Sequence, residues 1–336
     1  MAMSNVSLNG STLSSTLNFI QLQLGRYGMT FFSIFGNIGC ILNICVFLQP
    51  SLRANSCSVY FIATSIGNFL VLNFGLLTQL LNYGYNISPV NGISLFCKLR
   101  AYLSVVFTML ARSSLSIACV DRYASSSSNV RIRHFCHLNN AYRLLIINTL
   151  FWFIVQIHIL LFLDIKDGIC GIISNVYKTF NPFWNLIVVG LSMPLLMGIF
   201  GCMTLLNVRK MHQRIKLNTY TNSVANRIRS KDYQLITMLL FQVSVHILLI
   251  MPYQIHTLYS TLTQSMKKSS IQIIIEDFTS FITTFLTNIS SCLTFYIFTL
   301  TARTFRKELY NLLNDFCLNH LFKNKYSTNI SQRNNG

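Results

Sequence analysis

The feature that most constrains this 336-residue chain is a series of long stretches without charged side chains. Seven such windows follow one another; six contain no Asp, Glu, Lys or Arg, and the third contains only Arg112. Each has the ~20 residues that a helix needs to cross ~30 Å of hydrocarbon at ~1.5 Å per residue. We therefore expect seven membrane-spanning helices, within residues 27–52, 54–97, 101–120, 144–163, 179–208, 233–266 and 278–302.

The composition disfavours other classes of protein. Only 10% of the residues are charged, compared with ~25% in an average soluble domain, which argues against a water-soluble enzyme. The 26 Phe and 15 Tyr supply apolar surface that a disordered chain lacks. The net charge of +18 suits nucleic acid, but the basic residues lie between apolar runs rather than on one folded face, so no nucleic-acid partner is expected.

The same pattern selects the membrane fold and its orientation. The ~10-residue alternation of a β-barrel is missing, so the predicted fold class is all-α, a seven-transmembrane helix bundle in the lipid bilayer. Segments 52–57, 122–143, 209–231 and 303–336 hold 18 of the 26 basic residues, which places them in the cytoplasm and the N-terminus outside. The expected parts are an extracellular N-terminal segment (1–26), a helix domain (27–302), an amphipathic membrane-surface helix (303–316) and a cytoplasmic tail (317–336).

Cysteines and glycosylation sequences fit this topology. Of the 10 cysteines, only Cys97 and Cys170 fall at outer loop ends, where the compartment is oxidising, and we expect them to pair. Cys317 follows the short amphipathic stretch, so it is a candidate for S-palmitoylation. Three glycosylation acceptors fall on the expected outer side, at Asn5, Asn9 and Asn86.

Arg112 is the unusual residue within the windows. It stands nine residues before Asp121, ~13 Å along a helix, too far to reach the membrane surface easily. One interpretation is a hydrogen-bonding hub with Asn68, His246 or backbone carbonyls; the other is a conformational switch or an ion path. The hub is favoured, because no other window contains an acidic residue.

Two prolines inside windows, Pro194 and Pro252, predict helix kinks. Motifs typical of hydrolases, metalloproteases and phosphate-binding loops are missing, so no enzymatic activity and no cofactor are expected. His134, His137 and Cys136 lack a fourth ligand, and we expect no metal there.

The ordered motifs resemble those of rhodopsin-like G-protein-coupled receptors, over nearly the whole chain. Asp121-Arg122-Tyr123 closes the third window as that family's Asp-Arg-Tyr triplet does, 24 residues after Cys97. The other matching positions are Gly36-Asn37, Trp152, Cys170, Pro194, Pro252 and the start of the amphipathic helix at 305–309. The resemblance implies that Asp121 neutralises Arg122, and that an ion pair of Arg122 with Asp232 clamps the third and sixth helices in the resting state. Asp232→Ala should then raise ligand-independent signalling.

The sequence also departs from this family. Asn68 replaces the second-helix aspartate that binds sodium, His246 replaces a sixth-helix phenylalanine, and Cys202 replaces a fifth-helix tyrosine. Leu249-Ile250-Met251-Pro252 lacks the sixth-helix tryptophan, and residues 294–298 lack the Asn, Pro and Tyr of the seventh-helix motif. An intramembrane polar network of Asn37, Asn68, Arg112 and His246 is therefore expected, in which Arg112 and His246 near Pro194 replace the family's inner relay.

The resemblance also narrows the ligand. Ser104 stands where amine receptors carry an aspartate, and Asn288 lies near the level of the retinal-binding lysine of opsins, so both classes are disfavoured. Residues 171–179 are a candidate hairpin. Acidic residues at the mouth suit a basic, neuropeptide-like peptide. The predicted ligand pocket consists of Gln79, Ser104, Thr108, Gln254, His256, Thr284 and Asn288, rimmed by Glu276 and Asp277.

The expected function is that of a plasma-membrane receptor that transmits binding of an extracellular ligand to a cytoplasmic heterotrimeric G protein. Two alternatives stay open. One is a seven-span channel or transporter with Arg112 on its path, and the other is a receptor-like scaffold that no longer signals.

Overall fold

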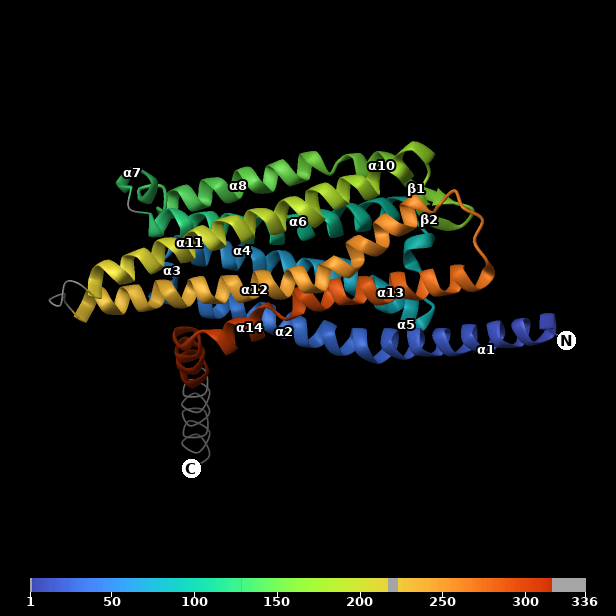
Figure 1. Cartoon of the computed structure of the whole chain (residues 1–336), viewed down its shortest axis with the longest axis horizontal. Coiled ribbons are helices and arrows are strands. Elements are labelled where there is room, and N and C mark those ends of the chain that lie inside the picture. The colour runs from blue at the N-terminus through green and yellow to red at the C-terminus, as the bar shows by residue number, and fades with distance from the viewer. Residues whose placement is uncertain (1, 128, 217–222, 316–336) are drawn as a thin grey trace, which may run out of the picture.

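The computed structural model describes residues 2–127, 129–216 and 223–315, with side chains outside 2–11, 189 and 210–233. The structure is 86% helical and belongs to the all-α class. Its helices lie side by side along one long axis (Figure 1), and the described residues contain one two-stranded hairpin.

Six helices are long and apolar enough to cross a membrane, and a bent pair of helices passes the same test together. The six are Thr12–Phe47, Ser56–Tyr85, Ser94–Ser126, Leu138–Phe162, Asn175–Arg209 and Gln234–Leu262. The pair is Ser270–Cys292 with Thr294–Thr301, bent by 49°. By the length and composition of its helices, the chain is a multi-pass membrane protein.

The first half of the chain forms the first four long helical segments. Its elements are α1 (Ala2–Gln23), the π-helical turn η1 (Leu24–Gly28), α2 (Met29–Phe47), α3 (Pro50–Arg53), α4 (Ser56–Val71), the π-helical turn η2 (Leu72–Leu76), α5 (Leu77–Tyr85), the 3-10 turn η3 (Pro89–Asn91), α6 (Ser94–Ser126), α7 (Val130–Arg133), α8 (Leu138–Val155) and α9 (His158–Phe162).

The second half begins with the hairpin. Its elements are β1 (Leu163–Lys166), β2 (Ile169–Ile172), α10 (Asn175–Asn185), the π-helical turn η4 (Leu186–Ser192), α11 (Met193–Lys216), α12 (Ser223–Leu262), α13 (Ser270–Cys292) and α14 (Thr294–Thr301). Residues 303–315 form the short helix expected after the last span, and it turns away from α14 (Figure 1).

The first helical segment begins earlier than the charge-free window predicts. The window opens after Arg26, but α1, η1 and α2 follow one another without a break from Ala2. Arg26 does not interrupt the helix because its charge is accommodated at the contact with α5. Its Nε donates to the Gly84 carbonyl (3.2 Å), and its guanidinium lies 5.5 Å from the Tyr85 ring centre.

The hairpin lies before and around Cys170, so the candidate position at 171–179 was wrong. β1 pairs antiparallel with β2, with Leu163 opposite Ile172 and Lys166 opposite Ile169. Asp167 (φ 54°) and Gly168 (φ 75°) make the turn. Asp-Gly is a favoured two-residue hairpin turn because both residues tolerate positive φ. The chain after β2 forms α10 instead.

α6 packs against α4, α8 and α11 and joins the two ends of the molecule. We call them the hairpin end, where β1 and β2 lie, and the Arg122 end, near α3 and α7 (Figure 1). α4 and α6 approach closely at Gly67, where an added Cβ would lie 3.1 Å from the Ala111 backbone nitrogen. Small residues permit such contacts between membrane helices.

The outer faces of several helices are apolar and exposed. Ile154, Leu161 and Leu248 are 67%, 72% and 73% exposed, on α8, α9 and α12. Apolar surface of this extent is expected where helices face lipid. The predicted kinks lie at Pro252 inside α12, which bends (Figure 1), and at Pro194 at the start of α11, directly after η4.

Candidate functional site

A cavity of about 360 Å³ lies between α4–α5, α6, α12 and α13. We call it the main cavity. Its volume falls in the ~300–1,000 Å³ range of small-molecule sites. The structure brings six of the nine predicted pocket residues to its wall: Gln79, Ser104, Thr108, Gln254, Thr284 and Asn288.

The other three predicted residues lie elsewhere. His256 and Glu276 line a second cavity of about 640 Å³ between α12 and α13. Asp277 is exposed and lines neither cavity. Glu276 forms an ion pair with Lys268 (2.6 Å), so half of the acidic rim expected from the sequence is neutralised by a neighbouring lysine.

Polar side chains of the main cavity link helices that are distant in sequence. Asn288 Nδ2 donates to Gln79 Oε1 (2.8 Å), which joins α13 to α5. Arg100 Nε donates to Thr78 Oγ1 (2.8 Å), which joins α6 to α5. Within the described residues, Ser104 Oγ has no hydrogen-bond partner. The cavity therefore combines fixed polar links with at least one polar atom that a ligand can engage.

Arg112 and Thr108 line both the main cavity and a small cavity of about 20 Å³. We call the latter the small cavity. Asn68 and His246 also line it, and the His246 ring Nδ1 lies 2.9 Å from Ser290 Oγ on α13. The structure thus gathers three of the four residues of the predicted network, Asn68, Arg112 and His246, around one point.

Among the described residues, no hydrogen bond of the Arg112 guanidinium joins this group, as a hub would require. Two hydrogen bonds meet instead at Thr294, whose Oγ1 accepts from Asn68 Nδ2 (3.3 Å) and from Gln242 Nε2 (3.1 Å). Asn37 belongs to a separate link, because its Oδ1 accepts from Asn73 Nδ2 (2.8 Å).

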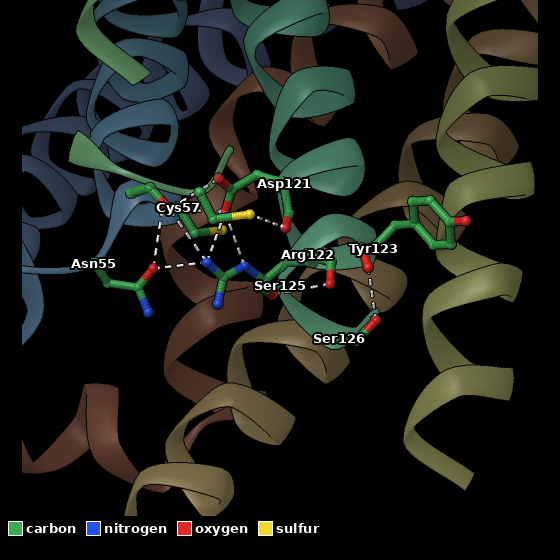
Figure 2. A network of polar contacts seen from close by, with 9 residues as sticks. Asn55, Cys57, Asp121, Arg122, Tyr123, Ser125 and Ser126 are labelled. Carbon is green, nitrogen blue, oxygen red and sulfur yellow. Dashed lines mark hydrogen bonds and ion pairs between the residues drawn. The ribbon is translucent and has the colours of Figure 1, made fainter. Parts of the chain in front are cut away.

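The Arg122 end contains a buried ionic cluster (Figure 2). Arg122 Nη2 donates to Asp121 Oδ2 (2.6 Å) and to Asn55 Oδ1 (2.7 Å). Ser56 Oγ donates to both carboxylate oxygens of Asp121, at 2.8 and 2.9 Å. Asp121 and Arg122 are 8% and 3% exposed, so this charge pair is largely removed from solvent. Charge-assisted hydrogen bonds of this kind are stronger than neutral ones.

The remaining residues of the triplet region face another helix. Tyr123 points away from Asn55 and toward α11 in Figure 2, and its ring lies 5.6 Å from that of Phe200. Asn207 Nδ2 donates to Ser126 Oγ (3.3 Å). The predicted partner Asp232 lies on α12, but its side chain is outside the described residues. The Arg122–Asp232 clamp therefore stays a prediction.

Cys136, in the segment after α7, also contacts this cluster. Its Sγ donates to the Asp121 carbonyl (3.3 Å). Burial, followed by the nearby Asp121 carboxylate, raises the pKa of the Cys136 thiol to about 12. The thiol is accordingly neutral near pH 7 and donates rather than accepts.

The predicted disulfide between Cys97 and Cys170 is confirmed. It ties the first turns of α6 to β2, with the two Cα atoms 5.9 Å apart. Asp164 on β1 reinforces this link, because Ser94 Oγ donates to it and Lys98 forms an ion pair with it (3.0 Å). These contacts, the Ser94 hydrogen bond foremost, lower the pKa of Asp164 to about 2.

The predicted modification sites are only partly covered by the structure. Asn86 is exposed at the C-terminal end of α5, in a left-handed conformation (φ 54°). The side chains of Asn5 and Asn9, and the whole of Cys317, lie outside the described residues. In the described part of the chain, no group of three or more His, Cys, Asp or Glu side chains is placed to hold a metal ion.

Sequence reasoning missed the residues that complete these networks. They are Asn55, Ser56, Gln242, Ser290 and Thr294. Asn55 stands directly before α4, where its Oδ1 caps the helix by accepting from Cys57 N (3.1 Å), so an N-cap signal was present. The others are isolated polar residues in apolar windows, and periodicity alone does not show which neighbour they meet.

The chain matches no protein-family model and no curated protein.

Proposed function

We propose that this protein is a receptor of the rhodopsin-like, G-protein-coupled type. In this proposal it spans the plasma membrane seven times, with α13 and α14 together forming the last span. The N-terminus and the hairpin end face the outside, and the Arg122 end faces the cytoplasm. The protein itself performs no enzymatic reaction; it transmits binding of an extracellular ligand, of the peptide type expected from the sequence, to a heterotrimeric G protein.

The course of α6 carries the proposal. This helix begins at the Cys97–Cys170 disulfide, passes the main cavity at Ser104 and Thr108, and ends at the buried Asp121–Arg122 pair. A ligand cavity and a buried charge pair thus share one rigid element. A two-state element that both sites contact is the physical basis of coupling between them.

In this proposal, ligand binding in the main cavity displaces α12, one of the helices that line it. α6, α12 and α13 all contribute to its wall, and α12 contains Pro252. A ligand that binds better when α12 is displaced about Pro252 shifts the population toward that state. In the displaced state Arg122 exchanges its contacts with Asp121 and Asn55 for contacts with the G protein, next to the basic segment 209–231.

Two other functions remain to be separated from this one. The main and small cavities meet at Arg112, which supports a channel or transporter with Arg112 on its path. The departures at residues 246, 249–251 and 294–298 support a receptor-like scaffold that binds a ligand without signalling.

Reconstitution of the purified full chain tests the proposal. In lipid nanodiscs with heterotrimeric G proteins, wild type should accelerate nucleotide exchange above empty nanodiscs. A screen of peptides, each with a free and with an amidated C-terminus, should contain members that increase it. Arg122→Ala should abolish the acceleration. Ion or solute flux in liposomes that depends on Arg112, without exchange on any G protein, would instead establish the channel or transporter. Neither exchange nor flux, together with ligand binding, would establish the scaffold.

A further inference from the structure

The charged side chains that line the main cavity are positive, whereas the sequence predicted an acidic rim. Two guanidinium groups line it, those of Arg100 and Arg112, and within the described residues its wall contains no Asp or Glu. The two arginines stand twelve residues apart on α6, or ~18 Å along the helix axis. Arg112 also lines the small cavity, so it lies at the inner limit of the main cavity, and Arg100 lies toward the hairpin end.

Within the described residues, Arg112 has no counter-charge. The ion pairs of the described residues join Lys98 to Asp164, Arg122 to Asp121 and Lys268 to Glu276, and none involves Arg112. No hydrogen bond from its guanidinium to a described residue is formed either. An arginine at membrane depth without an anionic partner is costly, and such residues mark binding sites or pathways. This feature separates Arg112 from Arg100, which donates to Thr78.

The rest of the wall suits the body of an organic anion. Ser104 Oγ, one helical turn before Thr108, has no partner within the described residues and can donate to an oxyanion. The Gln254 side-chain amide is buried and faces the same cavity. Val71, Val105 and Met109 provide apolar wall. The cavity therefore combines a positive charge at its inner limit with polar side chains and an apolar wall.

We propose that the main cavity binds a ligand through a carboxylate held by Arg112, with Arg100 attracting the anion at the mouth. This inference rests on the receptor role proposed above and specifies the chemistry of its ligand. A guanidinium holds a carboxylate by two parallel N–H···O bonds, a geometry that an uncharged amide does not match. The carboxylate belongs either to a small organic acid or to the free C-terminus of a peptide.

The proposal reverses the charge expected from Glu276 and Asp277. Glu276 is already paired with Lys268, and Asp277 does not line the main cavity. A basic ligand in this cavity would instead face two arginines. The ligand's charged group is therefore negative, whatever residues its outer part contacts.

Matched acid and amide probes test the proposal without any G protein. The purified full chain in nanodiscs is titrated with 3-phenylpropionate and with 3-phenylpropanamide, which differ only in the charged group. Gly-Gly-Phe with a free C-terminus and its C-terminal amide form the peptide arm. A ligand that binds only the folded state raises the unfolding midpoint, so Tm reports binding. We expect the acids to raise Tm and the amides to leave it unchanged, and the stronger arm identifies the source of the carboxylate.

Variants locate the binding to Arg112. Arg112→Gln should weaken acid binding roughly 30-fold or more, as expected for loss of one partner of a buried charge pair. Arg112→Lys should retain part of it, and Arg100→Gln should weaken it less. Arg26→Gln is the matched control, because Arg26 contacts Gly84 and Tyr85 and does not line the cavity.

Several outcomes would overturn the proposal. They are equal Tm shifts by acid and amide, acid binding that Arg112→Gln leaves intact, or no shift by any acid at 10 mM. If Arg112→Gln does not fold, the acid–amide comparison on wild type decides. Acid binding without nucleotide exchange would refute the receptor role and leave the carboxylate site standing. Nucleotide exchange without acid binding would support the receptor role and refute the carboxylate site.

Discussion

Arg122 Nη2 donates a 2.7 Å hydrogen bond to Asn55 Oδ1, the oxygen that also accepts the Cys57 backbone N–H at the start of α4. One side chain thus caps one helix and restrains the charged group of another. The position of the Asn55 oxygen therefore couples the Arg122 side chain to the start of α4. This coupling makes Asn55 the position at which the resting state is most simply tested.

Asn55→Ala should raise ligand-independent nucleotide exchange, because Arg122 loses a charge-assisted hydrogen bond to α4. It should also lower the free energy of unfolding by about 1 kcal/mol, the usual effect of losing an N-cap. Both are measured on purified protein in nanodiscs. Asn129→Ala is the matched control, because Asn129 caps α7 through Arg131 N (3.0 Å), whereas Asn55 caps α4 and also binds Arg122. Equal exchange by the two variants would argue against the restraint.

Alkylation of Cys136 should report the state of the Arg122 cluster. Because burial raises the pKa of its thiol to about 12, little thiolate is present at pH 7. The rate of reaction with N-ethylmaleimide should rise about tenfold per pH unit and continue to rise above pH 9, whereas an ordinary thiol levels off near its pKa of ~8.5. Mass spectrometry of the peptide containing Cys136 measures the rate.

The unfolded protein provides the control for this measurement, since its Cys136 should level off like an ordinary thiol. A plateau by pH 9 in the folded protein would contradict the burial of the thiol.

Thr294→Val should destabilise the contact between α4, α12 and α14. The methyl group fills the space of the hydroxyl, but Asn68 Nδ2 and Gln242 Nε2 lose their common acceptor. An unsatisfied buried donor costs about 1–3 kcal/mol. The unfolding midpoint should fall clearly for Thr294→Val and little for Thr294→Ser, which keeps the hydroxyl. Similar midpoints for both variants would show that the shared oxygen is unimportant.

Removal of the disulfide by Cys97→Ser with Cys170→Ser should lower stability by about 4 kcal/mol, the loop-entropy value for a sequence separation of 73. Thermal unfolding measures the loss, and reduction of the wild type should reproduce it. The double variant Cys45→Ser with Cys202→Ser removes two free cysteines and should leave the midpoint nearly unchanged. A loss below about 1 kcal/mol would indicate that the Ser94 and Lys98 contacts with Asp164 hold the hairpin alone.

Much of the architecture was visible in the sequence. The charge-free windows predicted apolar helices because lipid requires each spanning segment to satisfy its own backbone. The Cys97–Cys170 pair followed from the loop positions of the two cysteines. Six of the nine residues that the family resemblance implied for a ligand pocket line one cavity. The start of the first helix was missed, since a charge can be accommodated inside a helix when a neighbour satisfies it, as Gly84 does for Arg26.

The sequence by itself determined that the chain is apolar, helical and cross-linked near one end, because these properties depend on composition and on local spacing. Only the tertiary structure decided which polar side chains meet. Thr294 joins Asn68 and Gln242, Glu276 is neutralised by Lys268, and Arg112 lines a cavity in whose described wall no Asp or Glu lies. Such pairings depend on how helices rotate and pack against one another, and no single helix encodes that rotation.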